Sequence, residues 1–167
     1  MQINPKEIKS RYKMVPRTLV FIEKENKILL INRKKKNTFG FGKLNGIGGH
    51  IEKGEEPFES AKREILEESG LVVNSLDLVA LIFIEIGIDP GILLFVFNAK
   101  FPGGKLVPSD EGDLIWIQKG AINSMNNIVK DIPFLVNLCE KHKKEAPPFI
   151  CKYLYDEKKE LRIVMNS

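Results

Sequence analysis

The stretch from Gly49 to Leu71 reads GHIEKGEEPFESAKREILEESGL. Within it, Glu64, Glu67 and Glu68 stand at i, i+3 and i+4, so a helix would place their carboxylates on one face. Like charges at these separations repel by roughly 0.2–0.5 kcal/mol per pair, so the arrangement adds nothing to helix stability. Taken alone, an acid-rich face is more typical of plain solvated surface. A hard cation such as Mg²⁺ favours the other interpretation, because it binds to a few carboxylates together with waters and phosphates.

A helix is expected over residues 57–69. Pro57 suits the first helical position, where its missing N–H costs nothing. Phe58, Ala61 and Ile65 recur at helical spacing and form the expected buried face. Gly70 suits the C-terminal cap because glycine tolerates the left-handed conformation. The acidic residues therefore lie on the face opposite Ile65.

The rest of the chain predicts a mixed sheet with a second helix in one α+β domain spanning residues 1–167. The second helix is expected over 127–142, with Ile128, Ile132, Leu135, Val136 and Cys139 on its buried face. Residues 33–43 read as a loop, and 89–91 as a turn. Strands are expected over 14–23, 27–32, 44–51, 76–88, 92–100, 113–118, 149–155 and 161–165.

The bulk composition is that of an ordinary soluble domain, with 43% hydrophobic and 29% charged residues and a net charge of +4. No Lys/Arg block is long enough to predict a nucleic-acid arm. No apolar run reaches membrane-spanning length, and the N-terminus lacks a signal-peptide core. We therefore expect a cytoplasmic protein, monomeric or homodimeric, that binds neither nucleic acid nor membrane. Cys139 and Cys151 are expected to be buried, reduced thiols.

The acidic helix lies inside a longer pattern: Gly49, five residues, Glu55, seven residues, then Arg63-Glu64-Ile65-Leu66-Glu67-Glu68-Ser69-Gly70-Leu71. This pattern resembles the Nudix box at every defined position. The resemblance implies the Nudix fold, a mixed β-sheet sandwiched by helices with a loop–helix–loop motif. It also implies hydrolysis of a nucleoside diphosphate linked to another group.

The same resemblance implies the roles of the box residues. Glu64, Glu67 and Glu68 correspond to the metal ligands, and the backbone carbonyl of Gly49 also faces the metal. Arg63 and Glu55 correspond to an ion pair that holds the loop against the helix. Mg²⁺ is the implied cofactor, with Mn²⁺ as a substitute. Such cations neutralise a pyrophosphate and acidify an attacking water.

The residues before the box, Phe39 to Gly49, resemble those of MutT-like enzymes that degrade oxidised purine nucleoside triphosphates. The likeness implies that Phe39 lines the base pocket, that Asn45 hydrogen-bonds the purine, and that Lys35 lies near the phosphates. Asn45 as a turn residue is the alternative. The Arg33–Lys36 tract is otherwise expected to be solvated surface.

Further along, Glu111 falls where these enzymes have an additional metal ligand or base, although an acidic loop would also explain it. Glu64 is the first choice for the general base and Glu111 the second. Asp131 and Phe134 fall where the family has a base-reading Asp and an aromatic residue. Two departures stand beside them: Ile128 replaces a base-stacking Trp, and Lys130 replaces a second Asp.

The expected function is Mg²⁺-dependent cleavage of (oxidised) purine nucleoside triphosphates, such as 8-oxo-dGTP, to the monophosphate and pyrophosphate. One alternative is a Nudix hydrolase of another nucleoside diphosphate derivative, either a dinucleoside polyphosphate or a nucleotide sugar. Another is a ligand-sensing Nudix module without turnover, which degenerate box carboxylates would favour; here all of them are intact.

Overall fold

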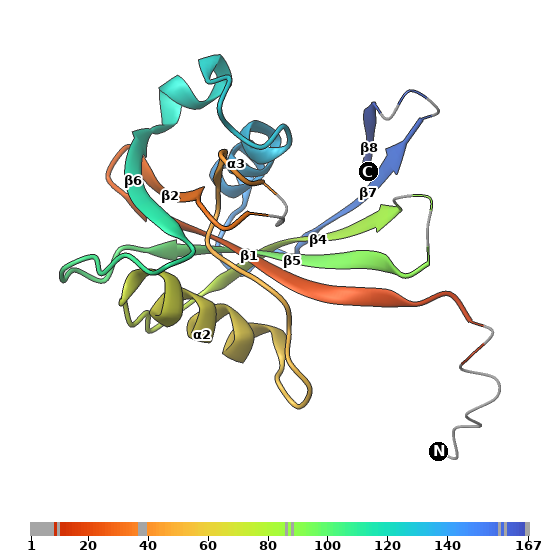
Figure 1. Ribbon diagram of the computed structural model, residues 1–167, viewed down its shortest axis with the longest axis horizontal. Coiled ribbons are helices and arrows are strands. Elements are labelled where there is room, and N and C mark those ends of the chain that lie inside the picture. The colour runs from red at the N-terminus through yellow and green to blue at the C-terminus, as the bar shows by residue number, and fades with distance from the viewer. Residues whose placement is uncertain are drawn as a thin grey trace.

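A computed structural model describes residues 9, 11–36, 40–85, 87, 89–156, 158 and 160–165. Over this part of the chain, eight strands form one mixed sheet in the order β3-β2-β1-β5-β4-β7-β8, with β6 paired to β2 (Figure 1). The β1–β5 and β4–β7 pairs are parallel, and the other strand pairs are antiparallel. The strands are β1 (Met14–Lys24), β2 (Lys27–Arg33), β3 (Leu44–Asn45), β4 (Asp77–Glu85), β5 (Gly91–Lys100), β6 (Gly112–Gln118), β7 (Phe149–Tyr155) and β8 (Leu161–Met165).

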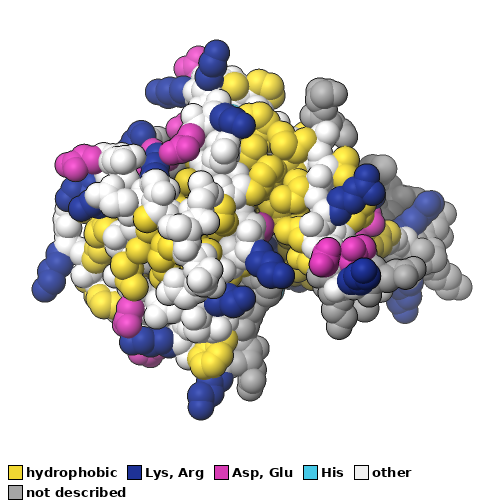
Figure 2. Space-filling model, turned by 90° about the horizontal axis from the view of Figure 1, so that it is seen from above, with side chains coloured by type: hydrophobic (Ala, Val, Ile, Leu, Met, Phe, Trp, Pro, Cys, Tyr) yellow, Lys and Arg dark blue, Asp and Glu magenta, His cyan; other side chains and the backbone are white. Residues whose placement is uncertain are grey.

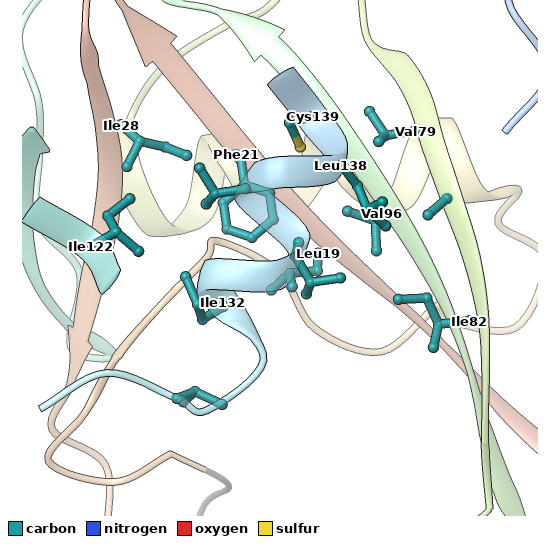
Figure 3. Packing of buried hydrophobic residues seen from close by; sticks show 14 of the residues in the cluster. Leu19, Phe21, Ile28, Val79, Ile82, Val96, Ile122, Ile132, Leu138 and Cys139 are labelled. Atoms are coloured by element: carbon teal, nitrogen blue, oxygen red, sulfur yellow. The ribbon is translucent and has the colours of Figure 1, made fainter. Parts of the chain in front are cut away.

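The sheet has one described α-helix on each face, as the expected Nudix fold requires (Figure 1). Helix α2 (Pro57–Ser69) buries Ala61 and Ile65 against a cluster that contains Val20 of β1. Helix α3 (Ile132–Lys141) packs over the opposite face, where Leu19 and Phe21 lie beneath it (Figure 3). The strand period of two directs neighbouring β1 side chains to opposite faces.

One edge of β1 holds the segment that leads into α2. Beyond its short pairing with β2, β1 is joined to residues 47–51 by backbone hydrogen bonds (Figure 1). Val20 N–H donates to the Ile47 carbonyl at 2.7 Å, and Thr18 N–H donates to the Gly49 carbonyl at 2.9 Å. These bonds fix the approach of the helix relative to the sheet.

One strand and one helix are shorter in the structure than the sequence predicted. The strand expected over 44–51 is regular only at Leu44–Asn45, because the glycines after it break the ladder. Gly48 has φ +146°, and a Cβ there would collide with the Thr18 carbonyl. The helix expected from residue 127 begins at Ile132, because Leu44 bonds to the Asn127 carbonyl and Val129 bonds back to Leu44.

A 3₁₀ helix, η1 (Lys119–Ser124), was not expected and fills the connection after β6. Cys139 and Cys151 are buried and free, as predicted, and burial raises the pKa of the Cys139 thiol to about 12. None of the helices in the described ranges is both long and apolar enough to span a membrane.

Candidate active site

Helix α2 is fixed at both ends by local interactions. The Glu56 side chain accepts from the N–H groups of Phe58 and Glu59, and Glu59 bonds back to the Glu56 N–H, which completes a capping box. At the other end Gly70 adopts φ +70° and donates to the Leu66 carbonyl. With the ends held and Ile65 buried, the acidic residues of the last two turns have defined positions.

Glu64 lies directly against the Gly49 backbone. A Cβ at Gly49 would collide with the Glu64 carboxylate, so the close approach requires glycine. The Gly49 carbonyl accepts from Thr18 N–H on β1, which leaves its second lone pair for another partner. Burial raises the pKa of the Glu64 carboxyl. These two groups, expected at one metal site from the resemblance to the Nudix box, lie side by side in the structure.

Arg63 holds the preceding loop to the helix. Its Nε and Nη2 donate to the two oxygens of Glu55 at 2.6 and 3.0 Å, so the expected ion pair is present and bidentate. Its Nη1 donates to Glu64 at 2.9 Å and to Glu67 at 3.0 Å, and Nη2 also reaches the His50 carbonyl. The Arg63 hydrogen bonds lower the pKa of Glu55 to about 2. One guanidinium therefore organises three carboxylates.

Arg33 holds two further carboxylates from the sheet side, a role that was not expected from the sequence. Its side chain is only 11% exposed, so the expectation of solvated surface for this tract is wrong at Arg33. It donates to Glu68 Oε1 and to the Gly48 carbonyl, both at 2.8 Å. The Gly48 N–H occupies the other Glu68 oxygen at 3.1 Å. Burial nevertheless raises the pKa of Glu68 to about 7.

Glu111 reaches the same place from the turn before β6. It accepts from Lys35 Nζ at 2.9 Å and from Arg33 at 3.4 Å. Lys35, expected near the phosphates, is thus brought to the acidic site as the partner of Glu111. We refer to Glu64, Glu67, Glu68 and Glu111 as the carboxylate cluster.

The chemistry of the carboxylate cluster fits a hard divalent cation. Its donors are all oxygens, which suit Mg²⁺ and Mn²⁺. Burial raises the pKa of both Glu64 and Glu68, and the nearby Arg63 and Arg33 offset this only in part. Among the described residues, however, no three acidic, His or Cys side chains already stand in a ligand arrangement. The ligand roles assigned to Gly49 and the four glutamates remain predictions.

Asn45 is a buried polar residue, 8% exposed. Its Oδ1 accepts from the Gly46 N–H at 2.8 Å, as a turn residue would. Its Nδ2 has no hydrogen-bond partner within the described part of the chain and lies near Gly40. The amide group thus stabilises the local turn, and none of the described residues accepts from its two N–H donors.

Asp131 immediately precedes α3 and makes no side-chain cap to it. Burial raises the pKa of its carboxyl, which favours the protonated form. The Tyr153 hydroxyl lies next to it and is buried without a hydrogen bond of good geometry. The Phe134 ring is 6.3 Å from the Tyr153 ring.

Ile128 is 5% exposed and forms a bridge with Leu44, so it is a core residue. It therefore presents no stacking surface of the kind expected of a Trp there. Phe39 lies outside the described residues. Within the described part of the chain, no hydrogen bond connects Asn45, Asp131 or Phe134 to the carboxylate cluster. Cavities of about 480 and 400 Å³ lie elsewhere, near Tyr12 and Glu85, and include none of the predicted site residues.

Comparison with known proteins agrees with this arrangement. A family model described as the NUDIX domain matches residues 13–126. The chain is 38% identical over 102 residues to an oxidized purine nucleoside triphosphate hydrolase of Mus musculus, covering 60% of this chain and 64% of that protein. It is 34% identical over 111 residues to an ADP-ribose pyrophosphatase of Methanocaldococcus jannaschii, covering 65% and 61%. The matches span somewhat under two thirds of each relative.

A solved structure of a MutT protein from Bacillus halodurans superposes with a TM-score of 0.70. It covers 92% of this chain and 98% of that one. At 22% identity, this likeness concerns the fold alone.

Proposed function

Because the chain belongs to the Nudix family, we propose that it is a divalent-metal-dependent pyrophosphohydrolase of (oxidised) purine nucleoside triphosphates. The observation that carries the proposal is the packing of the Glu64 carboxylate against Gly49, beside Glu67 and within the Arg63 network. Acidic oxygens therefore lie close to the Gly49 backbone. The products would be a nucleoside monophosphate and pyrophosphate, with Mg²⁺ as cofactor and Mn²⁺ as a substitute.

The residues that would hold the cation are Glu64, Glu67, Glu68 and Glu111 with the Gly49 carbonyl. When bound, a divalent cation supplies neutralisation of phosphate charge and acidification of water. Glu64 is our choice for the general base, since burial raises its pKa and makes it a better proton acceptor near neutral pH. Arg63 holds Glu64 and Glu67 in place, because one guanidinium bonds to both.

The nucleobase of the substrate would be recognised by residues on the α3 side of the sheet. Asn45 can donate two N–H groups, and its oxygen, which already accepts from the Gly46 N–H, keeps a second lone pair. A protonated Asp131 would also donate. Two donors favour a purine edge rich in acceptors. The purine specificity of the mouse relative supports the same choice.

A second candidate is cleavage of a nucleoside diphosphate derivative such as ADP-ribose. The archaeal relative is named for this activity. Ile128 also stands where similar enzymes have a Trp, so the chain lacks base stacking there, which is worth about 1–3 kcal/mol per base, and this weakens the case for oxidised purines. The carboxylate cluster would serve either substrate.

The test is a panel of dGTP, 8-oxo-dGTP, dATP, dCTP, ADP-ribose and a dinucleoside polyphosphate, assayed with Mg²⁺ for kcat/KM and products. We expect purine triphosphates to rank first. Asn45→Ala should lower kcat/KM for them about tenfold, the value of one hydrogen bond, and leave tripolyphosphate cleavage unchanged. Equal effects on all substrates would place base recognition elsewhere. Binding without turnover would indicate a sensing module.

A further inference from the structure

A third arginine, Arg17, lies near the site, and its guanidinium has no hydrogen-bond or ion-pair partner among the described residues. The side chains of Arg33 and Arg63 donate hydrogen bonds to carboxylates and carbonyls. The Arg17 side chain, on β1, makes no hydrogen bond or ion pair within the described residues, although the residue is partly buried. A guanidinium carries five N–H donors in a planar fork, and leaving them unsatisfied in a partly buried position is unfavourable. An unpaired group of this kind calls for an external anion.

The backbone of Arg17 places it beside the carboxylate cluster. Arg17 forms an antiparallel bridge with His50, and the next residue, Thr18, bonds to the Gly49 carbonyl. Gly49 is where the Glu64 carboxylate rests. Arg17 and Glu64 therefore flank the same short segment, and they interact electrostatically.

The side chain of Arg17 also adjoins an apolar surface. Strand alternation puts Arg17 on the same face as Leu19, beneath α3. The sheet register continues from Arg17 to Leu94 on β5 and then to Ile82 on β4, both of which belong to the apolar layer on this face. Seen from above, hydrophobic side chains are exposed on this side of the molecule (Figure 2). Arg17 thus lies at the border between acidic and apolar surfaces.

Electrostatics agrees with this position. Burial lowers the pKa of Arg17, and the neighbouring Arg33 lowers it further, while Glu64 acts in the opposite direction. The surroundings of Arg17 thus disfavour its charge, and Glu64 offsets this only in part. Phosphate matches a guanidinium fork in geometry and charge.

We propose that Arg17 binds the phosphate next to the nucleoside, between the carboxylate cluster and the apolar surface around the half-buried Leu94. This inference rests on the proposed function. The carboxylate cluster marks the position of the cleaved linkage and the apolar layer that of the nucleoside, so the group between them is the α-phosphate. In this position Arg17 orients the substrate and stays bound to the monophosphate product.

The experiment compares Arg17→Gln and Arg17→Lys with Arg162→Gln. Arg162 is an exposed residue on β8 and controls for the change in charge. Isothermal titration with Mg²⁺ would measure Kd for the purine nucleoside monophosphate and, separately, for inorganic pyrophosphate. Thermal unfolding would be recorded for each variant.

Arg17→Gln should weaken monophosphate binding about 10- to 100-fold, the range of a charge-assisted contact, with a much smaller effect on pyrophosphate. Arg17→Lys should recover part of the loss, and Arg162→Gln should match the wild type. The Tm of Arg17→Gln should stay equal or rise, because an unpaired charge is removed.

If Arg17→Gln bound the monophosphate as tightly as the wild type, and the wild type were active, the role proposed for Arg17 would be overturned while the proposed function would stand. A loss confined to pyrophosphate would also overturn it, because Arg17 would then bind the other end of the substrate. A wild type that neither binds nor cleaves any nucleotide of the panel would overturn the proposed function and this inference together.

Discussion

At the scale of single residues, the site is an excess of carboxylates held by two arginines. Arg63 contacts Glu55, Glu64 and Glu67, and Arg33 contacts Glu68 and Glu111. Glu67 is 56% exposed at its side chain, whereas Glu68 is 3% exposed and has both oxygens occupied. Glu64 and Glu67 are therefore the carboxylates best placed to exchange an arginine contact for a cation.

Replacing Glu64 or Glu67 with Gln should lower kcat by at least about 100-fold, because each change removes a negative charge from the predicted metal site while preserving shape. Circular dichroism should show an unchanged fold. Glu59→Gln is the matched control on the same helix, since Gln also completes a capping box. Near-normal rates in both site variants would show that the carboxylate cluster is not the catalytic centre. Excess chelator should abolish wild-type activity, and Mg²⁺ should restore it.

At the scale of elements, the site depends on how closely the segment before α2 approaches its neighbours. Gly48 packs against the Thr18 carbonyl of β1, and Gly49 packs against the Glu64 carboxylate of α2. The first neighbour is rigid backbone, and the second is the end of a flexible side chain. Substitution of alanine for each glycine should therefore have different effects on stability and on catalysis.

Gly48→Ala should destabilise the protein by about 2 kcal/mol or more, because both its φ and its contact are incompatible with a Cβ. Gly49→Ala should leave stability within about 1 kcal/mol, because the Glu64 side chain can move aside, but lower kcat at least tenfold by displacing that carboxylate. Gly120→Ala, which meets nothing within 4 Å, is the control. Urea denaturation would measure the loss of stability, and initial rates would measure the loss of kcat. A normal kcat in Gly49→Ala would contradict the prediction for Gly49.

At the scale of the whole molecule, the carboxylate cluster should destabilise the metal-free fold at neutral pH. The pKa of Glu68 is about 7 in the folded protein and near 4.5 when unfolded. A raised pKa means that its contribution is most favourable below pH 4.5 and is lost as pH rises through 7. In chelator, the free energy of unfolding of the wild type should therefore fall between pH 5 and pH 8 by up to about 3 kcal/mol relative to Glu68→Gln.

Urea denaturation at several pH values would measure this difference, with Arg162→Gln as a remote control. Mg²⁺ should raise the wild-type Tm at pH 8, because it binds the folded state only. Parallel pH profiles for the wild type and Glu68→Gln would show that burial of Glu68 is not costly.

Local spacing in the sequence was sufficient to predict α2, its proline start and its glycine end, because these signals lie within a few turns of chain. The Arg63–Glu55 pair was expected only from the resemblance to the Nudix box. The Nudix motif added the expectation of a mixed sheet between helices. By contrast, Arg33 meets Glu68 across 35 positions and Glu111 across 78, and Arg17 reaches the site through its register with His50. Those contacts depend on which strands are neighbours and on which face each side chain emerges, and only the folded sheet sets both.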